Sequence, residues 1–156
     1  MREISDIKKI IVHCSDSNFG DVAAIDRWHK EFGWAGCGYH YVITNGVIAK
    51  HDDYDIKQDG IIQKGREWKD IGAHCKGHNR DSIGICLIGK NHFTAKQLLV
   101  ALPNLLLMLG DLGIGAEGIF GHREFDKNRT CPNIDPMLIR NMVRLRAKSI
   151  ELRAKS

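Results

Sequence analysis

The chain has 156 residues, of which 43% are hydrophobic and 27% are charged, and its formal net charge at pH 7 is +4. These values are ordinary for a soluble globular protein, so we expect one domain that spans residues 1–156. The longest apolar runs, such as Leu105 to Leu109, are too short for membrane insertion, and the small positive excess favours an anionic partner without selecting nucleic acid, a membrane surface or a cell-wall polymer.

The first predicted elements are a strand and a helix. Residues 8–15, "KKIIVHCS", form a β-branched run that predicts a buried strand with His13 at its end. Residues 22–32 carry apolar side chains at helical spacing, with Asp21 as a possible N-cap and Gly33 as a possible stop. We therefore expect a helix over these residues.

The middle of the chain predicts β structure. Two β-rich runs in residues 38–52 flank Asn45-Gly46, a dipeptide typical of a two-residue hairpin turn. Residues 53–70 are polar and rich in glycine, and they predict no element. Residues 82–89, "SIGICLIG", are apolar between turn residues, which is typical of a central strand.

A helix is predicted next, from Thr94 to Leu109. Thr94 and Gln97 have the spacing of a capping box, and an apolar run follows them. Pro103 lies inside this run and should kink or split the helix, because proline lacks the N–H that the helix needs.

The last predicted elements are a short strand at 118–122 and a basic helix at about 135–153. Asp135-Pro136 supplies an N-cap and a first-turn residue. The helix has an apolar stripe of Leu138, Ile139, Met142, Val143 and Ile150. The repeated "RAKS" of its tail predicts a solvated basic end, with contact to an anionic polymer as the alternative. The order of elements predicts an α/β domain with a single mixed β-sheet flanked by helices.

The five cysteines are an odd number and include no CxxC pair. The N-terminal "MREISDIKKIIVHCSDS" has no apolar core or cleavage site of a signal peptide. We therefore expect synthesis in a reducing cytoplasm rather than a disulfide framework.

Two histidines and one cysteine form a candidate metal site. His13 and His122 lie at the ends of predicted strands, and Cys131 follows on the charged loop "GHREFDKNRTCPN". Three ligands would leave the fourth position of a tetrahedral zinc shell open, which is the catalytic pattern. A thiol and an imidazole could also pair as a nucleophile and its base, or His122 could be a surface residue and Cys131 a buried apolar one.

Four blocks in order, "IIVHCSDS", "WHKEFGWAGCGYHYVI", "GAHCKGHNRDSIGICLIG" and "GHREF…RTCPN", resemble the zinc-dependent N-acetylmuramoyl-L-alanine amidases. This is the type-2 amidase and peptidoglycan-recognition-protein superfamily, and the similarity is greatest to short phage endolysins of the T7-lysozyme type. It extends from about Ile10 to Asp135. The resemblance implies the fold of that superfamily, Zn²⁺ as cofactor and His13, His122 and Cys131 as its ligands.

The resemblance also implies two catalytic residues. Tyr39, in "GYHYV", matches the active-site tyrosine of the family, although a tyrosine there could instead fill the core. Arg129 stands where the phage enzymes usually have lysine, and Lys127, two residues before it, could instead be the active-site cation. An arginine stabilises an oxyanion but cannot lend a proton, so the leaving amine would take its proton from Tyr39 or from water at the metal.

Three further residues are predicted to contact substrate. His74 and Asn79, in "AHCKGHN", match positions that contact the muramyl-peptide in the superfamily, and both could instead shape a turn. Trp34 follows the helix stop, where it could line the binding groove or join the core.

The activity implied is hydrolysis of the amide between N-acetylmuramic acid and L-alanine in peptidoglycan by a monomeric endolysin. Such an enzyme is made in the host cytoplasm and acts on the cell wall after release. One alternative is a non-catalytic peptidoglycan-binding module of the same fold, although such modules typically lack a metal ligand. The other is a small basic nucleic-acid-binding protein, for which the sequence has no motif, so we expect no specific nucleic acid.

Overall fold

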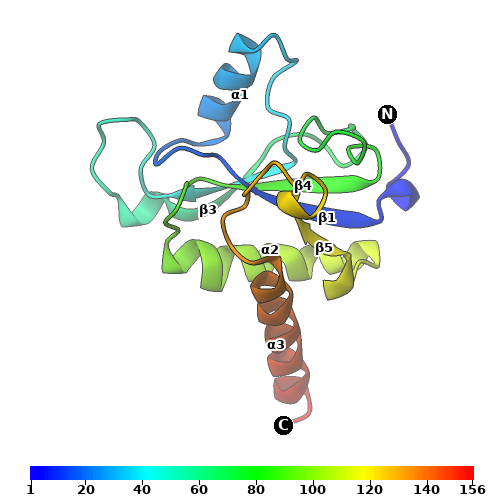
Figure 1. Ribbon diagram of the computed structural model, residues 1–156. Helices are drawn as coiled ribbons and strands as arrows, with labels where there is room; N and C mark the ends of the chain where they lie inside the picture. The colour runs from blue at the N-terminus through cyan, green and yellow to red at the C-terminus, as the bar shows by residue number, and fades with distance from the viewer.

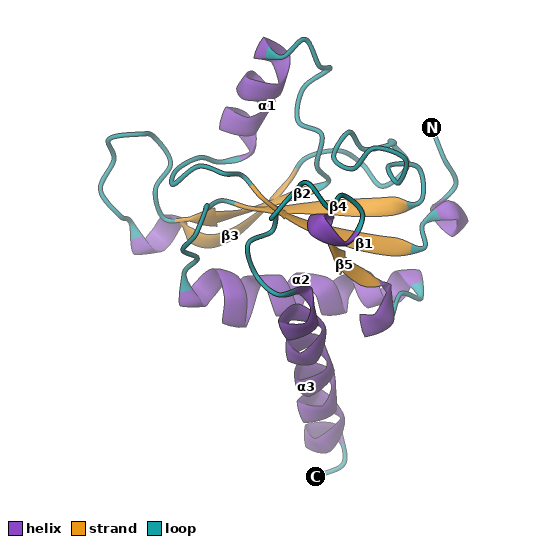
Figure 2. Ribbon diagram, viewed as in Figure 1, coloured by secondary structure: helices purple, strands orange, loops and turns teal.

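A single mixed sheet organises the computed structural model, which describes residues 1–156 (Figures 1 and 2). Its strands are β1 (Lys9–Cys14), β2 (Tyr41–Asn45), β3 (Asp59–Lys64), β4 (Ser82–Leu87) and β5 (Ile119–Gly121). Their order across the sheet is β3-β2-β4-β1-β5, and β2–β3 is the antiparallel pair. The predicted α/β class with one mixed sheet is confirmed.

Helices lie on both faces of this sheet (Figure 1). The bounds are α1 (Val22–Glu31), α2 (Leu102–Leu109, preceded by a wide helical segment at Lys96–Ala101) and α3 (Pro136–Ala154). α1 lies on one side, α2 runs along the other, and α3 crosses α2 and then extends away from the body. None of the helices has the length and apolar character that a bilayer span requires.

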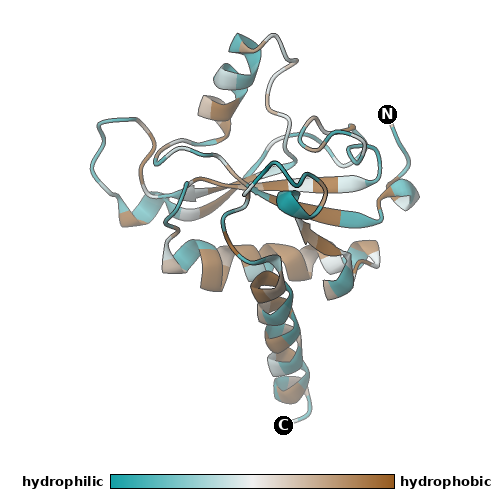
Figure 3. Cartoon of the chain, viewed as in Figure 1, coloured by the Kyte–Doolittle hydropathy of each residue, from teal (hydrophilic) through white to brown (hydrophobic).

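The two faces of the sheet bury apolar side chains unequally. Alternate strand residues such as Ile10 and Val12 join the large core under α2 and the first turns of α3, and these elements carry the apolar colour of Figure 3. The α1 face holds a smaller cluster that includes Val42 and Cys86. Because successive strand side chains point to opposite faces, His13 lies on this thinner α1 face.

The predicted helix starts are confirmed. The carboxylates of Asp21 and Asp135 each accept a hydrogen bond from a first-turn N–H, at 2.8 and 3.0 Å. Thr94 and Gln97 form a reciprocal capping box, with N–H to oxygen distances of 2.9 and 3.1 Å. These caps satisfy backbone donors that a helix cannot satisfy itself.

Pro103 coincides with the expected disturbance of its helix. The segment Lys96–Ala101 is a π-helix, with hydrogen bonds from i to i+5, and the α-helical pattern begins at Leu102. The ring of a proline excludes the carbonyl four residues before it. The helix changes type immediately before Pro103, in the segment that contains this carbonyl.

The prediction of a two-residue hairpin at Asn45-Gly46 is wrong. The chain does turn there, with Gly46 at a φ of +90°, but β2 pairs instead with β3, which lies in the stretch that predicted no element. The carbonyl of Val47 accepts a hydrogen bond from the N–H of Gly20 at 2.9 Å. Residues 47–52 form no strand.

The apolar stripe predicted for α3 is only partly buried. Ile139 and Val143 are in the core, whereas Leu138 and Ile150 are about half exposed. α2 covers only the first turns of α3, and the later turns extend beyond it (Figure 1). Position along the helix therefore decides burial here as much as helical spacing does.

Candidate active site

The carboxyl ends of parallel strands bring His13 and His122 together. β1 and β5 are parallel, and Val12 is in register with Gly121. The next residues along the chain are His13, which is still in β1, and His122, which directly follows β5; their ring centroids are 4.6 Å apart. Two residues that are 109 positions apart in sequence thus become neighbours through strand register alone.

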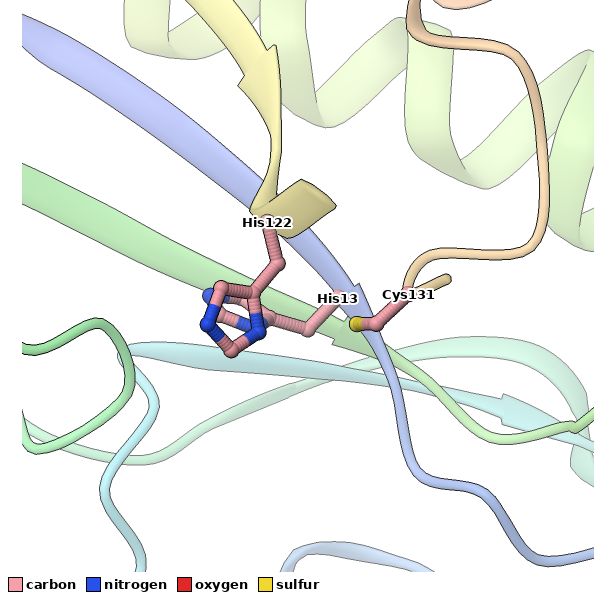
Figure 4. Close-up of side chains that lie close together, drawn as sticks. All are labelled: His13, His122 and Cys131. Atoms are coloured by element: carbon pink, nitrogen blue, oxygen red, sulfur yellow. The ribbon is translucent and has the colours of Figure 1, made fainter. Parts of the chain in front are cut away.

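The loop before α3 adds Cys131 to this pair (Figure 4). The backbone N–H of Cys14 donates to the Sγ of Cys131 at 3.2 Å, and the N–H of Arg123 donates to the Cys131 carbonyl at 2.8 Å. A Cβ on Gly121 would lie 2.8 Å from the ring of Pro132. The loop can therefore pack against the end of β5 because residue 121 is glycine.

The three side chains have the arrangement of a metal site. Their ligand atoms, one nitrogen from each histidine and the Sγ of Cys131, all lie within 4.8 Å of one another. Ligands bound to one zinc ion at about 2.0–2.3 Å are about 3.3–3.8 Å apart in a tetrahedron. Small side-chain rotations would close the remaining gap, so the donor set fits a tetrahedral ion with one position open.

Burial sets the protonation of these ligands. It lowers the pKa of His13 well below the ordinary value, with the nearby His74 and His122 adding to the effect. The pKa of His122 is lowered by burial and then by the charge of Arg129. Both imidazoles are therefore neutral at pH 7, the form that binds metal. The pKa of the Cys131 thiol is raised, first by its hydrogen bond with Cys14 and then by burial, so metal binding would release its proton.

Tyr39 lies beside the metal ligands. Its ring centroid is 5.1 Å from that of His13 and 5.6 Å from that of His29. Burial, and then the surrounding cysteines, raise the pKa of its phenol well above the ordinary value. The hydroxyl therefore keeps its proton at neutral pH and can act as a hydrogen-bond donor.

A cleft of about 640 Å³ opens beside the histidine pair, and His122 and Trp34 are among its lining residues. Trp34 is 50% exposed, and its ring packs edge-on against His29 with centroids 4.8 Å apart. It is therefore a wall of the cleft rather than a core residue. His29 was not singled out by the sequence, because a lone histidine on a helix has no distinguishing pattern.

The two loop cations differ in position. Arg129 lines the cleft together with Asp126, and its Nε is 3.5 Å from the Asp126 carboxylate. Lys127 is exposed and is not among the cleft residues. The cation that faces the cleft is therefore the arginine.

His74 and Asn79 both reach the cleft, but each already has contacts within the chain. The Asn79 side-chain oxygen accepts hydrogen bonds from the N–H groups of His74 and Cys75, at 2.8 and 2.9 Å. Asn79 thus shapes the loop, and its side-chain NH₂ makes no hydrogen bond within the chain. His74 is only 9% exposed, and its Nδ1 is 2.9 Å from the Nε2 of His13. This last contact could not be predicted from the sequence.

A mixed sheet that brings two histidines at its strand ends and a loop cysteine together beside a cleft has the donor set with which a hydrolase could hold a catalytic metal ion. Residues 3–134 match the family described as N-acetylmuramoyl-L-alanine amidase, and the chain belongs to that family.

Known relatives extend the match. The endolysin of Escherichia phage T7 is 35% identical over 136 residues, which cover 81% of this chain and 80% of the relative. Two solved structures have similar folds. They are the N-acetylmuramoyl-L-alanine amidase LysC from Clostridium intestinale (23% identity, TM-score 0.71, 91% of this chain and 89% of that one) and Drosophila PGRP-LB (27%, 0.60, 81% and 74%).

Proposed function

We propose that this chain is an endolysin that uses Zn²⁺ to hydrolyse the amide between N-acetylmuramic acid and L-alanine in peptidoglycan. The observation that carries the proposal is the His13, His122 and Cys131 cluster at the edge of a cleft, in a chain of the amidase family. When bound, Zn²⁺ acts as a Lewis acid that polarises a carbonyl and lowers the pKa of water to about 7. The three side chains would hold it and leave one position for this chemistry.

Tyr39 would stabilise the charge that develops on the amide oxygen. An amide under attack becomes an oxyanion, and a donor already in place stabilises that state more than the ground state. The raised phenol pKa keeps the Tyr39 hydroxyl protonated, and its ring lies 5.1 Å from that of His13. We therefore assign Tyr39 as the hydrogen-bond donor to the oxyanion.

Arg129 would act as an electrostatic clamp on the same oxygen. It is the cation of the loop that lines the cleft. A guanidinium keeps its proton throughout the pH range of enzymes, so Arg129 supplies charge and leaves proton transfer to other groups. A lysine at this place could do both.

The cleft would bind the muramyl-peptide on either side of the scissile bond. The half-exposed ring of Trp34 offers an apolar wall for a sugar or peptide face. The free NH₂ of Asn79 offers a donor for a peptide carbonyl. An enzyme of this kind, made in the cytoplasm of the host, would reach this substrate only after release to the cell wall.

Metal removal combined with ligand variants tests the proposal. Chelation should abolish turnover of a defined muramyl-peptide, and Zn²⁺ should restore it, because the metal supplies the Lewis acid. His122→Ala and Cys131→Ala should lose both bound zinc and turnover. The matched controls are His92→Ala, which changes an exposed histidine, and Cys37→Ala, which changes a buried cysteine outside the cluster. Near-normal turnover in a variant that lacks a proposed ligand would remove that residue from the site. Zinc binding without any turnover would favour a binding module.

A further inference from the structure

His74 is a buried histidine whose two ring nitrogens both have partners. Its Nδ1 lies 2.9 Å from the Nε2 of His13, and its Nε2 lies 3.4 Å from the Oγ of Ser82. His13 and Ser82 are themselves buried. No ring nitrogen of His74 is therefore free for a substrate in the cleft.

The direction of these hydrogen bonds follows from Ser82. Its hydroxyl donates to the backbone carbonyl of His78 at 2.6 Å, and a hydroxyl has one proton to donate. Toward His74, Ser82 can only accept, so this 3.4 Å contact favours a proton on the Nε2 of His74. The Nδ1 of a neutral His74 is then an acceptor, and the Nε2 of His13 must be the donor. His13 is thereby left with a bare Nδ1.

The backbone holds the ring of His74 in this position. A Cβ on Gly84 or on Gly72 would lie 2.5 Å from the Cδ2 of His74, closer than real Cβ contacts allow. The ring therefore lies in a slot that only glycine can form at these two positions. The side chain of Asn79 fixes the backbone on the other side by accepting the His74 N–H.

We propose that His74 is a positioning residue that holds His13 in the Nε2–H tautomer, so that the metal ligand is the Nδ1 of His13. The proposal rests on the proposed zinc function and deepens it. Hydrogen-bond partners of this kind orient a ligating imidazole and raise its basicity, and their loss typically reduces metal affinity about 10- to 100-fold.

The tautomer can be measured without any activity. Ring ¹⁵N shifts in the zinc-free protein at neutral pH should show His13 with its proton on Nε2, and the zinc-bound protein should show the same tautomer with the metal on Nδ1. In His74→Leu the zinc-free protein should lose the preference for the Nε2–H form. An Nδ1–H form of His13 in the unaltered zinc-free protein would overturn the proposal.

Zinc affinity, measured by competition with a chromophoric chelator, provides the second test. His74→Leu keeps the bulk of the ring but removes the acceptor, and it should weaken zinc binding about 10- to 100-fold. His74→Asn places an amide oxygen near the position of Nδ1, and it should restore most of the affinity. His92→Asn, which changes an exposed histidine outside the site, should leave the zinc affinity unchanged.

These outcomes distinguish a failure of the role proposed for His74 from a failure of the proposed zinc site. Unchanged zinc affinity in a folded His74→Leu protein would overturn the role of His74 and leave the zinc site intact. Equal losses in the Leu and Asn variants would also overturn it, because packing rather than the acceptor would then explain both. Failure of the unaltered chain to bind zinc would refute the metal site, while the tautomer of His13 would still report on His74.

Discussion

Replacing Arg129 with alanine should slow turnover without unfolding the protein. The side chain is 64% exposed, and its only ion pair is with Asp126 at 3.5 Å. Exposed pairs of this kind contribute less than about 1 kcal/mol to stability. For a chain of this size, that corresponds to a fall in Tm of less than about 4 °C.

The expected loss of turnover can be bounded from Coulomb's law. A unit charge about 4 Å from the developing oxyanion stabilises it by about 1 kcal/mol in bulk water and by about 4 kcal/mol at an effective dielectric constant near 20. The exposure of Arg129 places it nearer the aqueous limit. An effect of about 1–2 kcal/mol follows; since about 1.4 kcal/mol is a factor of ten in rate, Arg129→Ala should reduce kcat/KM about 5- to 30-fold.

Steady-state kinetics on a soluble muramyl-peptide, with zinc content measured in parallel, provides the assay. Arg129→Lys keeps the charge and should stay within about threefold of the unaltered enzyme. Lys127→Ala is the matched control, because this exposed cation of the same loop is not a cleft residue. A harmless Arg129→Ala together with a damaging Lys127→Ala would show that the clamp is the lysine.

The remaining predictions concern the tyrosine, a buried histidine and the core. Tyr39→Phe should lower kcat about 10²- to 10³-fold at unchanged zinc content, and a smaller fall would remove the hydroxyl from the oxyanion site. Burial lowers the pKa of His40 from 6.5 to about 4. Between these pH values the unfolded chain binds a proton that the folded chain excludes. The free energy of unfolding therefore falls by up to about 3 kcal/mol as the pH is lowered through this window. Urea unfolding at about pH 7.5 and about pH 4.5 should show the loss, and an equal loss in His40→Gln would assign it to other groups. Leu102→Ala, in the core, should lower the unfolding free energy by about 2–5 kcal/mol, whereas Leu145→Ala, at a position 69% exposed, should change it by less than about 0.5 kcal/mol; similar values for the two would contradict the assigned core.

Local signals predicted most of the fold because they depend on few residues. Strands β1 and β5, whose ends place His13 and His122, follow from short apolar runs, and the N-caps at Asp21 and Asp135 follow from single side chains. The prediction of a hairpin at Asn45-Gly46 was wrong because β2 pairs with β3, which lies in a more distant, polar stretch of the chain. The Asn-Gly turn signal alone does not determine which later segment pairs with β2.

The residues of the candidate site likewise fall into two groups: those that local signals predict and those that depend on the path of the folded chain. His13, His122 and Cys131 could be proposed because parallel strand ends and a following loop meet at one edge of a sheet. Whether Arg129 or Lys127 faces the cleft depends on the path of an irregular loop, which the sequence does not specify. The contact between His13 and His74 joins residues 61 positions apart through the β1–β4 pairing and two glycine gaps.

Mass analysis of purified peptidoglycan digested by the zinc-loaded protein tests the central claim most directly. Cleavage of the proposed amide adds one water per bond and should release stem peptides with a free L-alanine amino group, leaving glycan strands with intact sugar–sugar bonds. A chelated sample should release none. Products cut between sugars or inside the stem peptide, or release that persists after chelation, would contradict the assignment of this chain as a zinc-dependent N-acetylmuramoyl-L-alanine amidase.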